Sequence, residues 1–331
     1  MLVKSFPILF VAPSRIGDAV LSSGLLKRLV DEVPGARFTI VASALNAPLF
    51  AQTPGLETVI VLEKRPFGLH WFDLWRRVRR RRWGLVVDLR GSALSGFLRR
   101  KRRAVHRSDG PRAHKVVEAA KLLQLEAAPP APFLFTSADI EARAEQLTAG
   151  GAPILAIAPA ANWIGKTWPA ERYAMIARQL LGPGGALAGG RLMVLGGADD
   201  QAAAAPVKAA VSRTRCIDLV GAHDLLVSFA CLKRSRLFIG ADSGLMHLAA
   251  ASGAPTLGLF GPSDEELYRP WGEKGRTVRG SRSFADFKAM DPRLNQAICH
   301  MMDLRVATVA AAAEELLAQT QGGRIADDAN I

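Results

Sequence analysis

The chain has 331 residues, of which 49% are hydrophobic and 22% charged, a composition that excludes an intrinsically disordered protein. Its formal net charge of +13, from 43 Lys and Arg against 30 Asp and Glu, indicates an anionic partner such as nucleic acid, a membrane surface or a phosphorylated substrate. Only 7% of residues are aromatic and no aromatic-rich nucleic-acid motif is present, which counts against nucleic acid. Cys216, Cys231 and Cys299 form no CxxC pair, so neither a zinc site nor a disulfide framework is expected, and a reducing cytoplasm fits.

Short apolar runs alternate with helical patterns along the whole chain, and this alternation predicts parallel sheets covered by helices on both faces. The predicted strands are 7–12, 37–43, 58–62 and 84–90, then 153–160, 191–197, 216–221, 236–242 and 254–261. A proline-rich stretch at 126–135 and a glycine-rich stretch at 148–153 interrupt the alternation. We therefore predict an α/β protein of two doubly wound Rossmann-like domains, 1–150 and 151–331, facing a central cleft. Glycines and prolines break the uncharged segment 243–263, so no transmembrane helix is expected.

The sequence "SRIGDAVLSSGLLKRL" joins the first predicted strand to an amphipathic helix. Asp18 lies in the first turn of that helix, where an acid commonly serves as an N-terminal cap or favours the helix dipole. Alternatively, its carboxylate is a general base that accepts a proton from an attacking hydroxyl. Gly17 lets a substrate approach the backbone closely, and we expect Arg15 and Gly17 to contact that substrate.

The stretch "IGADSGLMHLAAASGAPTLGLFGPSD" is the most informative of the second half. A strand ends before Asp242 and Ser243, and a helix begins near Gly244, so exposed N–H groups and the helix dipole favour a phosphate there. Ser243 adds a hydroxyl donor, and His247 projects back toward the same helix end. A lone histidine is more often structural, but this spacing favours a functional one. An acid such as Asp242 beside a bound anion needs a separate reason, and a hydrogen bond from a sugar hydroxyl to its carboxylate would supply one.

Two further strand ends in the second half carry candidate residues. Lys166, in "GKTWPAERY", either places a positive charge on a phosphate or is an ordinary solvated lysine. Asp199 or Asp200, in "VLGGADD", either binds a ribose hydroxyl or caps the next helix. The sequence has no GxGxxG after a strand, which counts against a dehydrogenase, and no GxxxxGK[ST], which counts against a P-loop nucleotidase. It also lacks the GxSxG motif of α/β-hydrolases and any cluster with metal-ligand spacing.

With these motifs taken together, the chain resembles glycosyltransferase family 9, the ADP-heptose:lipopolysaccharide heptosyltransferases. The resemblance rests on the Asp18 and Ser243 segments quoted above, on "WGLVVDLRGSALSGFLRR", on "KTWP" and on "PWG" at 270–272, and it spans nearly the whole chain. It implies a GT-B fold with an acceptor-binding first half and a nucleotide-sugar-binding second half. It also implies inverting, metal-independent transfer of heptose from ADP-heptose to Kdo-lipid A or heptosyl-Kdo-lipid A, without a cofactor.

The same resemblance assigns roles to individual residues. Asp18 corresponds to the family's catalytic base and Lys166 to its phosphate-binding lysine. Asp242, Ser243, Gly244 and His247 correspond to its donor-binding loop, and Asp199 to an acid near the nucleotide ribose. The alternatives are a transferase or epimerase that uses another nucleotide sugar, and a non-catalytic basic protein that binds anionic lipid or nucleic acid.

Basic residues cluster in the first half of the chain. The segment 69–83 places aromatic residues among arginines that include Arg76, Arg77, Arg79 and Arg80, and "RRKRR" follows at 99–103. These clusters are either an ordinary solvated surface or a face that binds an anionic leaflet and a phosphorylated lipid acceptor. Arg90, at a predicted strand end, is a candidate for the acceptor phosphates. We therefore expect a cytoplasmic enzyme that is peripheral to the inner membrane.

Overall fold

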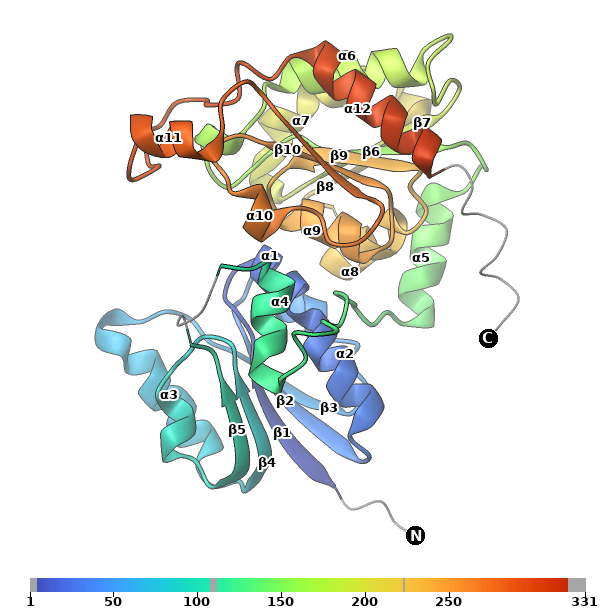
Figure 1. Ribbon diagram of the computed structural model, residues 1–331. Helices are drawn as coiled ribbons and strands as arrows, with labels where there is room; N and C mark the ends of the chain where they lie inside the picture. Colours follow the sequence, from blue (N-terminus) through green and yellow to red (C-terminus); the bar gives the residue numbers. More distant parts are fainter. Residues whose placement is uncertain (1–4, 108–111, 223, 321–331) are drawn as a thin grey trace. The chain divides into compact units, whose positions relative to one another are not determined.

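The computed structural model describes residues 5–107, 112–222 and 224–320, and it divides into two compact units, Met1–Ser137 and Ala138–Ile331 (Figure 1). Each unit contains one parallel β-sheet with helices on its two faces. The predicted division near residue 150 falls within the second unit, in the loop after α5 (Ala138–Thr148), a helix that packs against α8 (Leu225–Leu232). In the part of the chain that the structure describes, no helix combines the length and the apolar character needed to cross a membrane.

The first unit is a five-stranded sheet in the order β3-β2-β1-β4-β5. Its strands are β1 (Phe6–Val11), β2 (Ala36–Ala42), β3 (Leu56–Val61), β4 (Trp83–Asp88) and β5 (Arg100–Val105). Its helices are α1 (Ile16–Leu21), α2 (Ser23–Glu32), α3 (Leu69–Val78) and α4 (Lys115–Ala120), with 3-10 turns η1 (Ala47–Phe50), η2 (Pro66–Gly68), η3 (Leu94–Phe97) and η4 (Lys121–Leu123). The apolar side chains of α3 at 71, 74, 75 and 78 have helical spacing and pack on one face of this sheet.

The second unit is a six-stranded sheet in the order β11-β10-β9-β6-β7-β8. Its strands are β6 (Ile154–Ala158), β7 (Arg191–Gly196), β8 (Cys216–Val220), β9 (Leu237–Ala241), β10 (Thr256–Phe260) and β11 (Gly275–Arg279). Its other helices are α6 (Ala170–Leu181), α7 (Gln201–Lys208), α9 (Gly244–Ala251), α10 (Glu265–Tyr268), α11 (Phe284–Met290) and α12 (Val306–Gln319), with turns η5 (Ile164–Lys166), η6 (Ala198–Asp200) and η7 (Arg213–Arg215). Every residue of β6, β9 and β10 is buried, and α6, α7 and α12 complete the core on one face.

The strand orders locate a switch point in each sheet. In the first unit the chain runs outward from β1 to β3 and then returns to place β4 on the other side of β1. In the second unit it runs outward from β6 to β8 and then returns to place β9 on the other side of β6. Open parallel sheets bind ligands beyond the carboxyl ends of the strands at such points. The loops after β1 and β4, and after β6 and β9, are therefore the places to look for a site.

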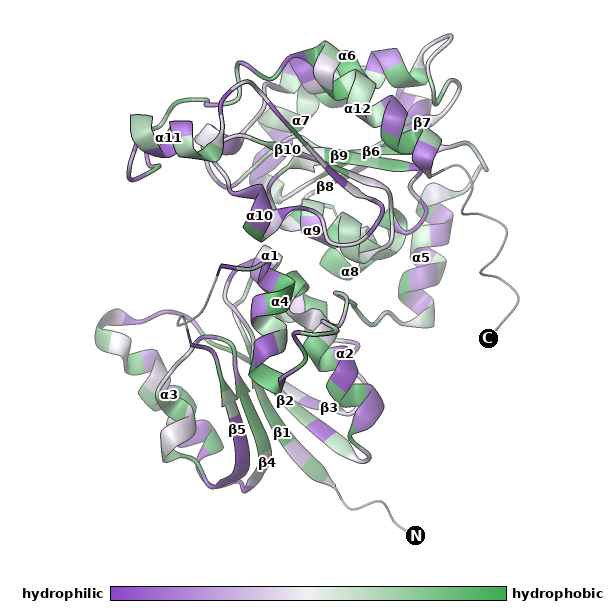
Figure 2. Cartoon of the chain, in the orientation of Figure 1, coloured by the Kyte–Doolittle hydropathy of each residue, from purple (hydrophilic) through white to green (hydrophobic). Residues whose placement is uncertain are grey.

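The two parallel sheets confirm the predicted doubly wound α/β architecture, but two strands were missed. The second basic cluster is not a simple surface loop, because Arg100–Val105 forms the edge strand β5. Figure 2 shows β5 as hydrophilic beside its apolar neighbour β4. The other missed strand, β11, is the edge of the second sheet and contains Arg276 and Arg279. Charged edge strands hinder pairing with other chains, and they lack the apolar run that reveals a central strand.

Candidate active site

Three of the predicted donor-binding residues meet at the switch point of the second sheet. Lys166 follows β6, Asp242 follows β9, and these strands are neighbours. The Nζ atom of Lys166 donates a hydrogen bond of 2.6 Å to Oδ2 of Asp242. The other carboxylate oxygen, Oδ1, lies 3.6 Å from Nε2 of His247. The carboxylate of Asp242 therefore links the loop after β6 to the first turn of α9.

Burial and pairing act in opposite directions on the Asp242 carboxyl. Only 6% of this residue is exposed, and the loss of solvent by itself raises its pKa. The hydrogen bond with His247 and the positive charge of Lys166 outweigh that effect and hold the pKa well below its usual range. Asp242 is therefore a stable carboxylate at neutral pH, and most of its charge is neutralised locally.

Tryptophan side chains fix the loop that carries Lys166. Trp168 is fully buried, packs edge-on against Tyr173, and donates from Nε1 to the carbonyl oxygen of Leu304 at 3.0 Å. Trp163 donates from its own Nε1 to the carbonyl oxygen of Gln296 at 3.1 Å. A Cβ atom at Gly165 would lie 2.4 Å from the Trp163 ring, so only glycine fits there. These contacts hold the turn η5 and its last residue, Lys166, at the sheet edge.

The start of α9 offers hydrogen-bonding groups that the protein itself does not use. Ser243 is the residue before α9, yet its side chain does not cap the helix. Within the described part of the chain, Ser243 Oγ and His247 Nδ1 are buried and have no hydrogen-bond partner. Buried polar atoms are almost always paired, so these two point to a ligand or to bound water. Gly244, the first helical residue, adds a backbone N–H at the same end.

The two candidate acids after β7 differ in their surroundings. Asp200 Oδ2 accepts a hydrogen bond of 2.7 Å from the backbone N–H of Gly197, and it thereby closes the turn η6. Asp199 is exposed, and no hydrogen bond joins its side chain to another described residue. Because β7 is the other neighbour of β6, Asp199 lies at the same sheet edge as Lys166, although the two side chains form no ion pair. The structure thus leaves Asp199, rather than Asp200, with a free carboxylate.

In the first unit, three side chains hold the loop before Asp18 by donating hydrogen bonds to its backbone carbonyl oxygens. The carbonyl oxygen of Ala12 accepts from Arg90 Nε at 2.7 Å, and that of Pro13 accepts from Asn46 Nδ2 at 2.6 Å. The carbonyl oxygen of Ser14 accepts from Ser43 Oγ at 2.8 Å. Side chains that follow two strands, β2 and β4, therefore fix the backbone that leads into α1.

Arg90 lies beside this loop because β4 pairs with β1. Asp88 is fully buried and accepts hydrogen bonds from the backbone N–H groups of Arg90 and Ser92, at 3.0 and 2.9 Å. Gly91 has a φ of 66°, and a Cβ there would lie 2.9 Å from the carbonyl oxygen of His106, so this tight turn requires glycine. Among the described residues, Arg90 Nη2 is buried without a partner. That unused donor is suited to an anionic oxygen.

Asp18 itself is half-buried in the first turn of α1, and Arg15 is the exposed residue before the helix. No described residue forms a hydrogen bond or ion pair with the Asp18 carboxylate. Its backbone carbonyl accepts from Ser22 Oγ at 2.9 Å, and this contact marks the break between α1 and α2. Asp18 is a first-turn acid, but the structure gives its carboxylate no capping partner. Gly17 is half-buried beside it.

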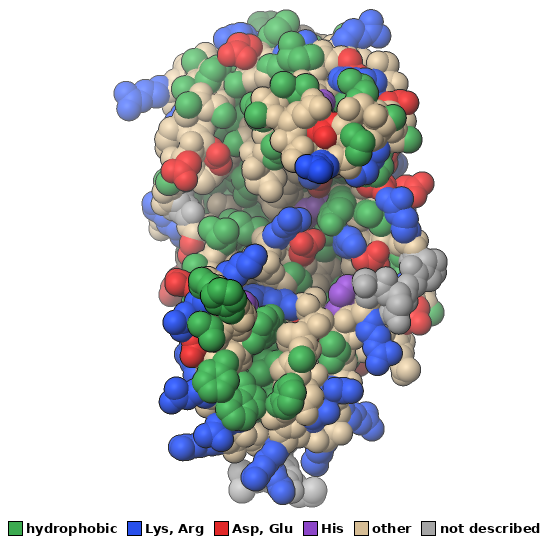
Figure 3. Space-filling view, turned by 90° about the vertical axis from the view of Figure 1, so that its left-hand side faces the viewer, with side chains coloured by type: hydrophobic (Ala, Val, Ile, Leu, Met, Phe, Trp, Pro, Cys, Tyr) green, Lys and Arg blue, Asp and Glu red, His purple; other side chains and the backbone are tan. Residues whose placement is uncertain are grey.

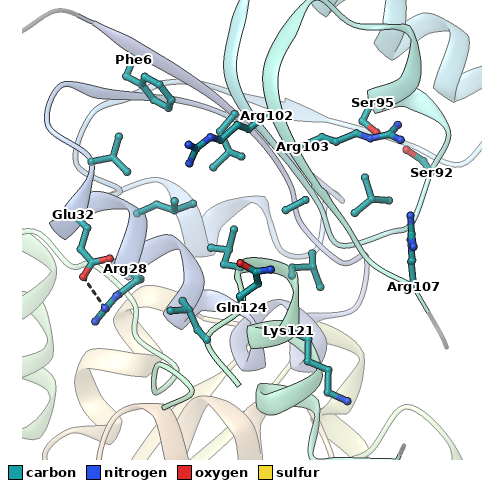
Figure 4. Close-up of a pocket in the computed structure, with 18 of the residues that line it drawn as sticks. Phe6, Arg28, Glu32, Ser92, Ser95, Arg102, Arg103, Arg107, Lys121 and Gln124 are labelled. Atoms are coloured by element: carbon teal, nitrogen blue, oxygen red, sulfur yellow. Dashed lines mark ion pairs between the residues drawn. The ribbon is translucent and has the colours of Figure 1, made fainter. Parts of the chain in front are cut away.

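A separate groove of about 820 Å³ crosses the first unit without touching any predicted site residue. It lies against β5, the end of α2 and η4 (Figure 4). Its lining combines apolar residues such as Phe6 and Leu85 with the basic residues Arg102, Arg103 and Lys121. Arg28 lines it too, but this arginine is paired with Glu32 at 2.7 Å.

Several residues that shape the two sheet edges were not predicted from the sequence. Asn46 and Asp88 act on the first edge, as described above. On the second edge, Arg279 donates to the carbonyl oxygen of Ser263 at 2.9 Å and is ion-paired with Glu265, which fixes the loop after β10. The backbone N–H of the buried His300 donates to the carbonyl oxygen of Gly165 at 3.3 Å. The partners of Asn46, Arg279 and His300 are distant in sequence, so no local pattern reveals these three residues.

Comparison with known proteins identifies the family. A model of glycosyltransferase family 9 (heptosyltransferase) matches residues 71–296. The chain belongs to this family. Lipooligosaccharide heptosyltransferase 2 of Haemophilus influenzae is 27% identical over 312 residues, which cover 82% of this chain and 88% of that protein. The family assignment confirms the predicted glycosyltransferase and excludes the alternative of a non-catalytic binder.

Solved structures support the GT-B fold. The Escherichia coli ADP-heptose lipopolysaccharide heptosyltransferase II structure has a TM-score of 0.74 at 22% identity, over 95% of this chain and 99% of that one. The structure of the Escherichia coli heptosyltransferase WaaC with ADP has a TM-score of 0.69 at 16% identity, over 94% of this chain and all of that one. This glycosyltransferase therefore has two Rossmann-like units of the GT-B type. The family match includes Arg90, Lys166 and Asp242, whereas Asp18 lies before it.

Replacing Asp242 with Asn tests the buried carboxylate. We expect the free energy of unfolding near pH 7 to fall by about 1–3 kcal/mol, because Lys166 and His247 lose a charged partner. A lowered pKa stabilises the folded state above the unfolded value of about 3.9 and stops doing so as the pH falls through the folded value. The difference from wild type should therefore be constant from about pH 8 to 5 and shrink below about pH 4. Urea unfolding at several pH values measures it.

The matched control is Asp218→Asn, which removes a carboxylate that is 46% exposed and paired with Lys208 at 2.8 Å. Exposed pairs contribute about 0–1 kcal/mol, so this variant should unfold almost like wild type. An Asp242→Asn effect no larger than that of the control would contradict the structural role given to Asp242.

Proposed function

We propose that this glycosyltransferase moves heptose from ADP-heptose to the lipopolysaccharide inner core, with inversion at the anomeric carbon and without a metal ion. Kdo-lipid A and heptosyl-Kdo-lipid A both fit as acceptors. Family membership, the similarity to known heptosyltransferases and the fold shared with the WaaC structure, which was solved with ADP, support this proposal. The observation that carries it is the group Lys166, Asp242 and His247 at the switch point of the second sheet.

In this proposal the second unit holds the diphosphate of the donor. A lysine ammonium has three N–H donors, and the pair with Asp242 uses one of those on Lys166. The others remain for phosphate oxygens, and the Ser243 hydroxyl and the N–H of Gly244 add donors at the positive end of α9. His247 Nδ1 is a further buried group that a ligand would satisfy.

The other donor-side acids have different roles. Asp199 keeps the ribose assignment, because its carboxylate is not needed for the turn that Asp200 closes. Asp242 contributes chiefly through Lys166, since both its oxygens already face cationic or hydrogen-bonding partners. It aims the ammonium group and prevents that side chain from swinging into solvent.

Asp18 is the proposed base for the acceptor. Its carboxylate takes the proton of the acceptor hydroxyl while the hydroxyl oxygen bonds to the anomeric carbon. On the opposite side of that carbon the bond to the diphosphate oxygen breaks, and ADP leaves with the electron pair. Arg15 and Gly17 border the acceptor, and Arg90 offers its unused Nη2 to an acceptor phosphate or carboxylate. In this proposal Asp18 contributes the rate enhancement that comes from general-base catalysis.

The donor site is tested with Lys166→Ala. Hydrogen bonds to charged groups contribute about 1.5–3 kcal/mol, so the Kd for ADP should rise about tenfold or more. Part of that loss comes from the Asp242 carboxylate, which then faces the phosphate without its partner. The double variant Lys166→Ala, Asp242→Asn should therefore bind ADP more tightly than Lys166→Ala alone.

Calorimetry with a chelator present measures these affinities, and Lys274→Ala, a lysine elsewhere in the second unit, is the control. Unchanged ADP binding by Lys166→Ala, or binding that the chelator abolishes, would refute this donor site.

The base is tested with Asp18→Asn. Asn and Asp rank together at helix N-caps, so a capping role predicts nearly normal turnover and melting temperature. A base role predicts a turnover about 10²- to 10⁴-fold lower, with the ADP affinity and the fold retained. Single-turnover kinetics with ADP-heptose and each of the two acceptors distinguishes these roles and identifies the preferred acceptor. Asp31→Asn, in the next helix, is the control, and near-normal turnover by Asp18→Asn would remove the base from this mechanism.

We also propose that the basic face of the first unit attracts an anionic leaflet, which makes the enzyme peripheral to the cytoplasmic side of the inner membrane. Arg76, Arg77, Arg79 and Arg80 are all exposed on or just after α3. Each basic residue near such a surface contributes roughly 1 kcal/mol, and salt screens this attraction over a Debye length of about 8 Å at physiological ionic strength.

Neutralising these four arginines with Gln should lower binding to vesicles that contain phosphatidylglycerol and leave the ADP affinity intact. Flotation assays at increasing salt measure the effect. The control neutralises Arg143, Arg178, Arg213 and Arg293, four exposed arginines of the second unit, and so changes the net charge equally. Equal loss in both variants would show that net charge, and not this face, decides the binding.

A further inference from the structure

Large aromatic side chains are exposed on the same side of the first unit as the arginines. Phe67 is fully exposed, Phe97 is 73% exposed and Phe72 is 54% exposed. Together with the half-buried Trp71 and Trp75 they form what we call the aromatic face. Figure 3 shows hydrophobic side chains gathered on this side of the molecule, bordered by Lys and Arg. Contiguous apolar patches of this kind mark interaction sites.

The core of the first unit does not need the three exposed phenylalanine rings, whereas Trp71 and Trp75 pack partly against it. α3 fills the core with Leu74 and Val78, which are buried, and Phe72 points away from that side. Phe72 stacks on Trp75 with ring centres 5.7 Å apart, and Trp75 Nε1 donates to the carbonyl oxygen of Phe97 at 3.2 Å. The exposed rings are therefore held in place on the surface.

Phe67 adds a second, independent observation. Its φ of 54° lies in the left-handed region, where a bulky residue is a genuine outlier. It precedes Gly68, which shares the left-handed conformation, at the start of α3. Because the Phe67 side chain is fully exposed, its burial within the fold contributes no stabilisation that would offset the backbone strain. Such strain is retained where a function outside the fold uses it.

Between α3 and η3 the aromatic face encloses a groove of about 420 Å³, lined almost entirely by apolar side chains. The rings of Trp71, Phe72, Trp75 and Phe97 form its walls, and residues 92–94 close it. This closing segment begins two residues after Arg90, and the Arg90 guanidinium lies 6.0 Å from the centre of the Trp71 ring. The apolar groove and the candidate acceptor-binding arginine are therefore adjacent within one unit.

The charges around the groove select among possible occupants. Arg79 lies over the ring of Trp75, a residue of the groove wall, at 4.7 Å. Arg76, Arg77 and Arg80 belong to the same segment and line a separate depression together with Arg79 and Asp73. Asp73, the acid within α3, is ion-paired with Arg65. A second copy of the same face would bring like charges together. Aromatic rings surrounded by arginines match the boundary between lipid headgroups and acyl chains, where rings sit among the chains and arginines among the phosphates.

We propose that the aromatic face inserts into an anionic lipid bilayer, with acyl chains entering the groove and lipid phosphates meeting the surrounding arginines. The proposal rests on the proposed function only for the identity of the acceptor, a membrane lipid that would then reach Arg90 from the same surface. Membrane binding then has two components: the electrostatic attraction, which salt screens, and a hydrophobic component, which salt does not screen.

The test removes the hydrophobic component alone. In the variant Phe67→Ser, Phe72→Ser, Phe97→Ser every changed side chain is exposed, so its melting temperature should stay close to that of wild type. Binding to phosphatidylcholine–phosphatidylglycerol vesicles is measured by flotation at about 0.15 M and about 1 M NaCl, where the Debye lengths are about 8 Å and 3 Å. Wild type should retain a salt-resistant bound fraction, and the variant should lose that fraction, with a partition coefficient lower by about tenfold or more.

The matched control is Met175→Ser, Met290→Ser, which removes side chains that are 51% and 58% exposed in the second unit. It should bind vesicles like wild type. Equal salt-resistant binding by wild type and the triple variant would overturn the proposal. A triple variant that changes the sedimentation coefficient of the protein without lipid would also overturn it, because a second copy would then be the occupant.

A reporter at the face gives a direct readout. The protein has six tryptophans, of which Trp71 and Trp75 lie in the aromatic face. Brominated phosphatidylcholine mixed with phosphatidylglycerol should quench the wild-type fluorescence, whereas the variant Trp71→Phe, Trp75→Phe, which keeps the other four tryptophans, should be quenched much less. Quenching by monomeric brominated lysolipid but not by vesicles would assign the groove to a single lipid molecule and contradict bilayer insertion. None of these assays contains donor or acceptor, so their failure is distinguishable from loss of the transferase reaction.

Discussion

The buried carboxylate of Asp242 is the constraint on which the switch point of the second sheet depends. A charge that is 6% exposed is tolerated only when it is paired, and here Lys166 and His247 supply the partners. The pairing joins the ends of β6 and β9, the two strands between which the chain changes direction in the second sheet. An acid beside a proposed diphosphate site would ordinarily repel the ligand. Its charge is instead used to hold an ammonium group that keeps donors to spare.

The switch-point loop of the first unit is fixed by a different set of contacts, which do not involve its acid. Here the backbone of the switch-point loop is fixed through its carbonyl groups by Arg90, Asn46 and Ser43. The carboxylate of Asp18, which follows, makes no hydrogen bond or ion pair with another residue that the structure describes. A carboxylate that no described residue engages is open to contact with a bound substrate, as the proposed base must be. One unit thus neutralises its acid and the other leaves its acid available, which matches a division into diphosphate binding and base catalysis.

The sequence allowed the central strands and the switch-point motifs to be predicted, because buried parallel strands are continuous apolar runs and their carboxyl ends share one edge. It did not reveal β5 and β11, since edge strands rich in arginine lack that pattern. Nor did it predict the pairing of Lys166 with Asp242, which are distant in sequence and meet only through the strand order. The supporting roles of Asn46 and Arg279 depend on similar contacts across the sequence, with Pro13 and Ser263.

The two kinds of positive charge in this protein act over different distances. Lys166 is balanced by a buried acid, so its effect is confined to atoms that touch it, as recognition of one diphosphate requires. The arginines around α3 are exposed and outnumber nearby acids, so their charge acts over a Debye length, the range that the proposed binding to a membrane surface uses. A lipid acceptor diffuses in two dimensions, and an enzyme bound to the same surface meets it at a high effective concentration. Arg90 lies beside the aromatic groove at the switch point of the first sheet. Under the proposed function, binding of the enzyme to the membrane surface therefore also brings Arg90 to the lipid acceptor.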